Sequence, residues 1–539
     1  MSAEIIILSD AIFDSVSDRP FAGGIAVTDG RIIFVGSKEA TLSYCDVNTK
    51  KYDYGNMLVI PGLCDSHVHF SGGVDYVSEY ICKELDEAKS EKECVQIMVR
   101  FAEKYPELPR YCGIGWLPAY WGEGAELPTK LSLDKYFPDK PVYLQAVDGH
   151  SLWVNSKALE ESGYTADYKA AYGSAGMLAN GEFSGLLREM AANLARAKMW
   201  AKEEPLKKQM YLDFIRSLNA VGITAVSDVT PCLPEQIDNN FGLLKELDQE
   251  DACTIRVYMY PGTDVEPSRI AELKGFCDKY NSERLHIAGV KGLMDGVTSA
   301  FTAAMLEPYS DAPDEIGSIN KSAEQFEKWV IEANKNGYSV RIHSIGDAAT
   351  RISLDCYEAS NKVNDNCGVR NAVEHIEVIH PDDIGRFVKL GVIASMQPAH
   401  IPLEKGEKIY RVGDRSKYEW ALNSIVKTGA HMAFGTDCPV TDFNPFVNIY
   451  AALTRKHKDG TQYGVTSLKE TVSLPQAIKA YTIEGAYINK TEDKLGTLEA
   501  GKIADIAVFD RNWFDITPED ILNTKTLLTV FDGKIVYEG

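Results

Sequence analysis

The feature that most constrains the fold is a series of short apolar segments that alternate with longer helical segments through the middle of this 539-residue chain. Parallel strands need a crossover between them, usually a helix, so this alternation indicates a parallel α/β sheet or barrel. The segments that we expect to be strands are residues 63–70, 223–229, 255–260, 287–294, 339–344, 372–376, 392–396 and 432–437. Eight such strands predict a (β/α)8 barrel of the TIM type.

Two more strand-like segments, residues 110–116 and 142–147, lie between the first and second of these strands. More than 150 residues separate Phe70 from Ile223, whereas a βα unit needs about 30. We therefore predict an insertion after the first barrel strand, covering about residues 71–205.

Both chain ends show a different pattern, with short β-type segments separated by turns. Asp29-Gly30 and Asp532-Gly533 are each flanked by apolar segments, and Asp-Gly is a preferred turn for a tight hairpin. The two ends thus predict one small β-sandwich formed by residues 1–58 and 486–539, with the barrel over 59–485.

Composition narrows the class of protein. The formal charge of −22, without a cluster of Lys and Arg, argues against nucleic-acid binding. No apolar segment approaches the roughly 20 residues that cross a bilayer, and the N-terminus lacks a basic leader. The eleven cysteines are scattered and odd in number, unlike a disulfide framework. We expect a cytoplasmic protein that acts on a small molecule and contacts neither membrane nor nucleic acid.

A His-x-His pair ends the first predicted barrel strand. The segment Asp65-Ser-His67-Val-His69 follows the apolar residues 57–64. Side chains two apart on a strand project from the same face, so both imidazoles can reach one metal ion. The pair alone is ambiguous, because two core or surface histidines would look the same.

Other candidate ligands end or interrupt later apolar strands, namely Lys291, His343, His375 and Asp437. A buried charge or imidazole costs several kcal/mol unless it is paired or bound to metal. Each also has an ordinary alternative: a core histidine, a lysine reaching solvent or a turn aspartate. Their recurrence at strand ends, where barrels carry their active sites, favours a shared metal site.

The ordered motifs resemble the amidohydrolase superfamily, specifically the branch of YtcJ-like proteins and N-substituted formamide deformylases (amidohydrolase family 3). The resemblance runs almost end to end, through Pro61-Gly-Leu-Cys-Asp-Ser-His67-Val-His69, Gly113-Ile-Gly-Trp116, Asp148-Gly-His150, Lys291 with Asp295-Gly296, His343-Ser-Ile-Gly-Asp347, Glu374-His375, Gln397-Pro-Ala-His400, Gly435-Thr-Asp437-Cys-Pro439 and Leu495-Gly-Thr-Leu-Glu-Ala-Gly501.

The resemblance implies a role for each ligand. His67 and His69 would bind the more buried metal, and His343 and His375 the more exposed one. Lys291 would bridge both as an N-carboxylated side chain, because an ammonium cannot coordinate a cation whereas a carbamate has two anionic oxygens. Asp437 would bind the buried metal and act as the catalytic residue that takes the proton of the attacking water.

Zinc is the expected metal, as one or two ions, because the ligands are imidazoles and carboxylates. The thiols of Cys64 and Cys438 lie beside these ligands in the sequence. We expect both to pack as small apolar side chains. Homo-oligomer formation is expected from the family alone.

Three functions are compatible with this site. The first is a hydrolase of carbon–nitrogen bonds other than peptide bonds, acting on an N-acyl, N-formyl or cyclic amide through a metal-bound hydroxide. The second is a deaminase of a heterocyclic amine. The third is a non-catalytic, barrel-based binding protein, which the complete ligand set disfavours.

Substrate-contacting residues should lie in the insertion and in loops beyond the strand ends. Trp116, His150 and His400 are the candidates. Packing within the insertion is the alternative for Trp116, and capping of the turn after Asp148-Gly149 is the alternative for His150.

Overall fold

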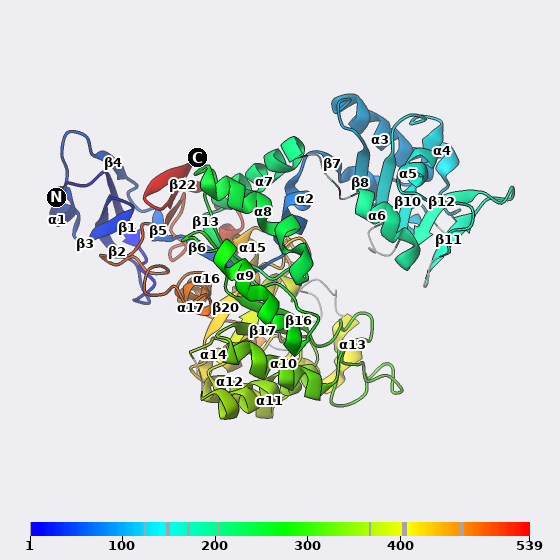
Figure 1. Ribbon diagram of the computed structural model, residues 1–539. Coiled ribbons are helices and arrows are strands. Elements are labelled where there is room, and N and C mark those ends of the chain that lie inside the picture. The colour runs from blue at the N-terminus through cyan, green and yellow to red at the C-terminus, as the bar shows by residue number, and fades with distance from the viewer. Residues whose placement is uncertain are drawn as a thin grey trace. The chain divides into compact units, whose positions relative to one another are not determined.

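The computed structural model describes residues 2–122, 125–146, 151–169, 173–199, 201, 204–365, 368–401, 407–462 and 468–539. The chain divides into two compact units. The larger unit contains residues 1–76 and 211–539, and the smaller contains residues 77–210. Figure 1 labels many of the elements of both units, which we describe one at a time.

Two parallel sheets form the centre of the larger unit. The first has the order β15-β14-β13-β6 and the second the order β16-β17-β18-β19-β20. Their strands are β6 (Leu63–Val68), β13 (Ile223–Asp228), β14 (Arg256–Met259), β15 (Leu285–Ile287), β16 (Gly289–Leu293), β17 (Ser339–Ser344), β18 (Ala372–His375), β19 (Ile393–Met396) and β20 (Met432–Phe434).

Each of the eight predicted segments contains a strand, but the segment 287–294 is divided in two. β15 pairs with β14 and β16 pairs with β17, so the chain passes from one sheet to the other at Ala288. The amide of Ala288 donates to the carbonyl oxygen of Met259 at that point (2.9 Å). The mixed α/β class is confirmed. The described strands are not joined in one closed sheet, so the barrel stays a prediction.

Helices separate the strands of both sheets (Figure 1). They are α2 (Phe70–Val77), α7 (Glu204–Asn219), α8 (Ile237–Gln249), α9 (Leu273–Lys279), α10 (Ala323–Lys335), α11 (Asp347–Asn364), α12 (Pro381–Leu390), α13 (Glu407–Val412), α14 (Leu422–Lys427), α15 (Pro445–Thr454), α16 (Leu474–Tyr481) and α17 (Ile483–Ile488). Helix α12 shows why the chain folds this way locally. Pro381 occupies its first turn, where no amide donor is needed, and Gly391 ends it with φ 67°.

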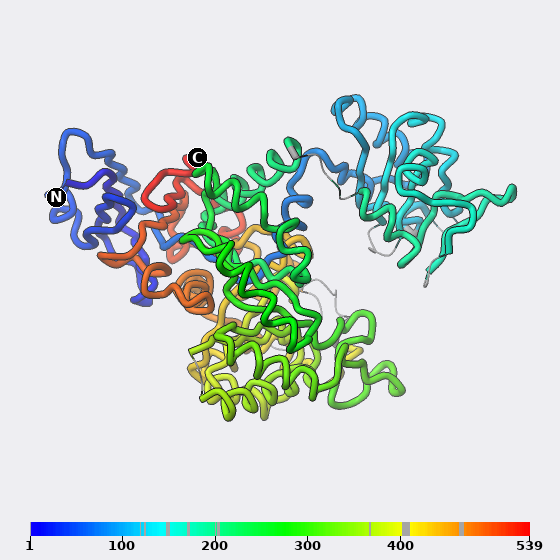
Figure 2. The backbone as a smooth tube through the Cα atoms, viewed as in Figure 1, coloured from blue at the N-terminus to red at the C-terminus, as the bar shows by residue number. Residues whose placement is uncertain are grey.

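The two chain ends meet in one eight-stranded sheet, visible as adjacent blue and red segments in Figure 2. Its order is β23-β22-β21-β5-β1-β2-β3, and β4 pairs with β1. The strands are β1 (Ile5–Ile12), β2 (Phe21–Thr28), β3 (Arg31–Gly36), β4 (Lys50–Asp53), β5 (Leu58–Pro61), β21 (Ile506–Phe509), β22 (Thr526–Phe531) and β23 (Lys534–Glu538). Short helices α1 (Lys38–Leu42) and α18 (Pro518–Ile521) accompany them.

Both expected hairpin turns are present in this sheet. Asp29 and Gly30 have φ of 49° and 73°, and Asp532 and Gly533 have φ of 51° and 72°. These values are those of a turn whose twist suits two antiparallel strands. The division into a β-sandwich and a barrel at the predicted boundaries stays a prediction.

The smaller unit has a six-stranded sheet of order β11-β12-β10-β9-β8-β7. Pairing is parallel from β7 to β9 and antiparallel among the others. The strands are β7 (Ile81–Cys82), β8 (Tyr111–Trp116), β9 (Val142–Ala146), β10 (Ser151–Val154), β11 (Ser174–Met177) and β12 (Phe183–Arg188), with helices α3 (Glu91–Lys104), α4 (Lys130–Asp134), α5 (Ser156–Glu161) and α6 (Asn193–Met199).

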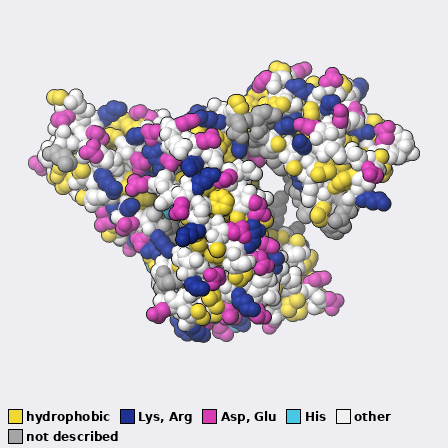
Figure 3. Space-filling model, viewed as in Figure 1, with side chains coloured by type: hydrophobic (Ala, Val, Ile, Leu, Met, Phe, Trp, Pro, Cys, Tyr) yellow, Lys and Arg dark blue, Asp and Glu magenta, His cyan; other side chains and the backbone are white. Residues whose placement is uncertain are grey.

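Acidic and basic side chains are interspersed over the face of the molecule that Figure 3 shows. Among the described residues, no helix combines the length and apolar character needed to cross a bilayer.

A buried ion cluster ties β14 to the end sheet of the larger unit. The guanidinium of Arg256 donates to the carboxylates of Asp505 and Asp532, and only 1% of the Arg256 side chain is exposed. Asp505 is also buried, with 5% exposed. Because burial raises the pKa of Asp505 while Arg256 lowers it, loss of the guanidinium would leave a buried carboxylate without its main counterion.

We expect Arg256→Ala to lower the free energy of unfolding by about 3 kcal/mol or more, the usual effect of breaking a buried ion pair from one side. The midpoint of thermal unfolding, followed by circular dichroism, measures this. The control is Lys534→Ala, because its ion pair with Asp251 is 2.6 Å long but more than half exposed on both sides and should matter little. Equal midpoints for the two variants would contradict the role assigned to Arg256.

Candidate metal centre

The candidate ligands lie in or just after strands of the two parallel sheets. His67 and His343 are the second-last residues of β6 and β17, and His375 is the last residue of β18. His69 follows β6, and Asp437 follows β20. All of these are therefore at the carboxyl ends of strands, as predicted. Lys291, in contrast, is the central residue of β16.

Three of these side chains form a compact cluster. The Nε2 atoms of His67 and His69 lie 3.3 Å and 3.1 Å from Oδ1 of Asp437. One potential ligand atom from each residue lies within 4.8 Å of those of the other two. His67 and Asp437 are buried, and His69 is partly exposed. Two imidazoles and a carboxylate at this spacing can hold one divalent cation.

A second pair of imidazoles lies beside this cluster. The ring centroids of His343 and His375 are 4.5 Å apart, and those of His67 and His375 are 4.8 Å apart. Nδ1 of His375 is 4.0 Å from Oδ2 of Asp437. Lys291 pairs in register with Arg341, two residues before His343. The structure thus brings the six predicted ligands to one region.

Neutral imidazoles are required for metal binding, and the site favours them at two positions. Burial and the nearby Lys291 lower the pKa of His343 to about 4. Burial, with His343 and His67 close by, lowers the pKa of His375 well below its usual value. Nε2 of His343 donates to the carbonyl oxygen of Gly296 (3.2 Å), which leaves the lone pair on Nδ1.

The carboxylate of Asp437 stays ionised despite its burial. Burial by itself would raise its pKa, but His67, His69 and His375 lower it well below the usual value. The pKa of His67 is raised overall. Burial alone would lower it, but the nearby carboxylates of Asp437 and Glu374 outweigh that effect. The cluster is therefore an alternation of carboxylate and imidazole groups, as in a site built for a cation.

A second carboxylate, that of Glu374, accepts a hydrogen bond from the ring nitrogen of His67 that points away from Asp437. Nδ1 of His67 donates to Oε2 of Glu374 (2.5 Å), so its lone pair is on Nε2, the atom near Asp437. Nε of Arg341 donates to the other oxygen of Glu374 (2.5 Å). Both Arg341 and Glu374 have 0% side-chain exposure. Arg341 also donates to the carbonyl oxygen of Ser66 (2.5 Å).

Backbone contacts fix the two metal-ligand segments against each other. The amide of Asp437 donates to the carbonyl oxygen of His67 (2.7 Å), and Asp65 accepts hydrogen bonds from the amides of His67 and Thr436 (3.1 and 2.9 Å). Gly435 permits this approach, because a Cβ there would lie 2.4 Å from the amide nitrogen of His67. Only glycine fits at this position without displacing the strand.

Two candidate ligands have a left-handed backbone that side chains other than glycine rarely adopt. His375 has φ 74° and Asp437 has φ 60°. This conformation costs roughly 1–2 kcal/mol per residue, and such strain concentrates at functional sites, where the surrounding structure enforces it. Here it occurs at the last residue of β18 and just after β20, where each side chain joins the cluster.

The residues present fit a divalent metal. Nδ1 of His375 is buried and has no hydrogen-bond partner among the described residues. Lys291 is likewise buried, and no described carboxylate lies within ion-pair distance of its ammonium. A neutral imidazole nitrogen without a partner and a lysine without a close counterion are both costly in a protein interior, unless a bound group completes them.

The three predicted substrate-contacting residues do not all lie at the metal cluster. Nε2 of His400 lies 3.4 Å from Oδ2 of Asp437, so His400 belongs to the cluster region. Trp116 is buried in the smaller unit, where its indole donates to the carbonyl oxygen of Leu144 (2.7 Å) and packs edge-on against Trp153. This placement favours the packing alternative for Trp116. His150 lies outside the described residues.

The two cysteines beside the ligands are buried. Sγ of Cys64 donates to the carbonyl oxygen of Gly485 (3.5 Å), and burial raises the pKa of its thiol to about 12. Burial also raises the pKa of Cys438. Neither thiol is a thiolate at neutral pH, which agrees with packing roles.

Sequence reasoning assigned no role to Glu374 or Arg341. A signal was present, because each places a charge inside an apolar strand, and the two charges are opposite. Their pairing became evident only from the register, in which β17 and β18 are neighbours and His343 lies opposite Glu374.

The chain matches the model of a known protein family, described as the amidohydrolase family, over residues 51–537. It is 30% identical to Protein LONG AFTER FAR-RED 3 of Arabidopsis thaliana, over 99% of this chain and 92% of that one. It is 26% identical to the putative amidohydrolase YtcJ of Bacillus subtilis, over 98% of both chains. It is 24% identical to the N-substituted formamide deformylase of Arthrobacter pascens, over 96% of this chain and 95% of that one.

A solved structure supports the same assignment at the level of the fold. An uncharacterized metal-dependent hydrolase from Pyrococcus horikoshii superposes with a TM-score of 0.79 over 95% of this chain and 99% of that one, at 24% identity. The family recognised from the motifs is thus confirmed by sequence and by fold. The chain belongs to the amidohydrolase family.

Proposed function

We propose that this amidohydrolase cleaves a carbon–nitrogen bond other than a peptide bond in a small molecule, namely an N-acyl, N-formyl or cyclic amide. The observation that carries the proposal is the cluster of His67, His69 and Asp437 at the carboxyl ends of β6 and β20. The similarity to a protein named N-substituted formamide deformylase supports the N-formyl class in particular.

The metal would be zinc, as one or two ions. His67, His69 and Asp437 would hold one ion, His343 and His375 a second, and Lys291 would contact both. This is a set of imidazole and oxygen donors, which suits zinc. A bound zinc ion supplies activation of water near neutral pH and polarisation of a carbonyl oxygen.

Asp437 would act as the general base and then as the general acid. Its ionised carboxylate can accept a proton from the attacking water, whose oxygen forms the new bond to the carbonyl carbon. The same proton then passes to the leaving nitrogen as the carbon–nitrogen bond breaks. His400, 3.4 Å from the other oxygen of Asp437, would contact the substrate at this point.

Glu374 would be a positioning residue for His67. Its hydrogen bond to Nδ1 holds the imidazole in the tautomer with a free Nε2 lone pair. Arg341 would hold Glu374 in turn, because their ion pair is completely buried.

Lys291 would be N-carboxylated. Its amine nitrogen attacks carbon dioxide, forms a new nitrogen–carbon bond and releases one proton, which yields a carbamate. Burial lowers the pKa of Lys291 to about 8, so the neutral amine needed for this step becomes abundant near pH 8. The carbamate also replaces a buried cation that has no close counterion among the described residues.

We also propose that the two parallel sheets are halves of one (β/α)8 barrel. Hydrogen bonds at both junctions support this, one from Asp437 to His67 and one from Ala288 to Met259. The barrel would cover residues 59–485 with an insertion at about 71–205, and residues 1–58 and 486–539 would form the β-sandwich. We further propose that the protein is cytoplasmic and forms a homo-oligomer.

The main test is a screen of the zinc-loaded protein against N-formyl amines, N-acyl amines and cyclic amides, with detection of the released amine or acid. We expect hydrolysis without release of ammonia. Asp437→Asn should lower kcat by about 10²–10⁴-fold, the usual range for a general acid–base group, while bound zinc, measured by elemental analysis, is largely retained. Asp442→Asn, five residues later, is the matched control.

Three results would contradict this proposal. Ammonia as the product would favour a deaminase. Stoichiometric zinc without turnover of any amide would favour a binding protein. Undiminished turnover by Asp437→Asn would remove Asp437 from the mechanism.

Carboxylation of Lys291 can be observed directly. Protein incubated with ¹³C-labelled bicarbonate at pH 8 should show a carbamate carbon resonance by NMR, because the lysine amine is then largely neutral. Lys291→Met should lack that resonance, whereas Lys321→Met, which removes a lysine paired with Asp264 at 3.3 Å, should retain it. A resonance of equal intensity in Lys291→Met would show that the signal comes from elsewhere.

The positioning role of Glu374 predicts a separation of stability from metal affinity. Glu374→Leu leaves Arg341 buried without its carboxylate and should lower the unfolding free energy by about 3–5 kcal/mol. Adding Arg341→Met removes the unpaired charge and should restore most of that stability. Zinc affinity, measured by chelator competition, should stay about 10–100-fold weaker in the double variant. Recovery of full zinc affinity there would mean that Glu374 is merely structural.

A further inference from the structure

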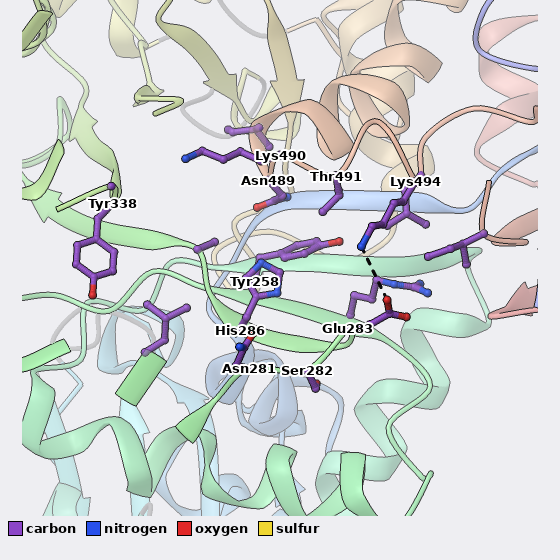
Figure 4. Close-up of a pocket in the computed structure, with 17 residues that line it drawn as sticks. Tyr258, Asn281, Ser282, Glu283, His286, Tyr338, Asn489, Lys490, Thr491 and Lys494 are labelled. Atoms are coloured by element: carbon purple, nitrogen blue, oxygen red, sulfur yellow. Dashed lines mark ion pairs between the residues drawn. The ribbon is translucent and has the colours of Figure 1, made fainter. Parts of the chain in front are cut away.

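The larger unit contains a pocket of about 700 Å³ that the proposed chemistry does not use (Figure 4). Its wall combines residues of β14 and β15, the two residues that precede β17, and residues of the segment 488–503, which leads from α17 into the end sheet. The volume is in the range of small-molecule sites.

This pocket is separate from the metal cluster. Tyr338 lines it just before β17 begins, whereas His343 lies near the other end of the same strand. Five residues of extended strand span roughly 16 Å. The pocket therefore lies at the amino end of β17, away from the end of that strand that carries His343.

Two lysines and one carboxylate give the pocket wall its charge. Lys490 and Lys494 line it with Glu283, whereas the guanidinium of Arg256 is already paired with Asp505 and Asp532. Lys494 and Glu283 form a loose, half-exposed ion pair of 3.8 Å, drawn dashed in Figure 4. Lys494 also acts on the neighbouring His286, whose pKa is lowered by burial and by this ammonium. In a chain of net charge −22, such a wall is suited to an anion.

Lys490 has a backbone conformation that favours glycine. It lies two residues after the end of α17, with φ 58°. Glycine or asparagine is usual at such a helix terminus, and other residues pay roughly 1–2 kcal/mol there. A lysine at this position thus contributes less to folding than glycine would, which directs attention to its charge at the pocket.

Aromatic and hydroxyl groups make up much of the remaining wall. Tyr258 and His286 pack edge-to-face, with ring centroids 5.0 Å apart, and Figure 4 shows them next to each other. Ser282 and Thr491 add hydroxyl groups, and Leu495 adds an apolar surface. A ligand with a ring and an anionic head would match both parts of this wall.

We propose that this pocket is a second small-molecule site, which binds an aromatic or heteroaromatic compound that carries a phosphate or carboxylate group. Lys490 and Lys494 would bind the anionic head. The ring would pack on Tyr258 and His286. The proposal does not depend on which amide the metal centre hydrolyses.

Phenyl phosphate is a suitable probe, and isothermal titration calorimetry with the full-length, zinc-loaded protein measures its binding. We expect it to bind, and phenol, which lacks the charge, to bind far more weakly. Lys490→Gly should raise the dissociation constant about tenfold, as for loss of one hydrogen bond to a charged group. Its thermal stability should be maintained or increased, because glycine tolerates this backbone conformation.

Two control variants locate the binding. Lys490→Arg keeps the positive charge and should bind phenyl phosphate as the unaltered protein does. Asp437→Asn alters the metal cluster only, so its affinity for phenyl phosphate should be unchanged. The proposal is overturned if the unaltered protein does not bind the probe, if Lys490→Gly binds it equally well, or if Asp437→Asn abolishes binding.

Discussion

The buried ion pair between Arg341 and Glu374 is the constraint on which the rest of the candidate metal centre depends. Both side chains are fully removed from solvent, and an unpaired charge in such a place costs several kcal/mol. The pair is satisfied only when β17 and β18 are neighbours in the observed register and when β6 brings Ser66 and His67 within reach. The requirement to neutralise these charges therefore also fixes the orientation of His67 and, through its backbone, the position of Asp437.

Local pattern was enough to predict the strands and the hairpin turns, because apolar alternation and Asp-Gly turns act over a few residues. It was not enough to predict how strands pair. Residues 287–294 resemble one strand in the sequence, yet Ile287 ends β15 in one sheet and residues 289–293 form β16 in the other. The break at Ala288 is set by its hydrogen bond to Met259, a residue almost thirty positions earlier, which no local pattern contains.

At the candidate site, too, local pattern identified individual residues but not their partners. The types and strand-end positions of His67, His69 and Asp437 were enough to propose them as a metal-binding cluster, and their side chains do lie together. Glu374 was not predictable, because a carboxylate in a strand becomes interpretable only when its partners are known. Trp116 illustrates the alternative that the sequence left open, since its buried indole donates a hydrogen bond to the carbonyl oxygen of Leu144, a placement that favours packing over contact with a substrate.

The two ends of the parallel strands are joined by buried polar contacts rather than by apolar packing alone. Oδ1 of Asn489, in the wall of the amino-end pocket, accepts a hydrogen bond from the hydroxyl of Tyr260 (2.9 Å). The ring of Tyr260 in turn packs against the guanidinium of Arg341, 4.7 Å from its centroid, and Arg341 holds the carboxylate that orients His67. Each of these groups is buried, so each needs its neighbour to remain satisfied. A chain of buried contacts thus links Asn489, in the wall of the pocket, to His67 in the candidate metal cluster.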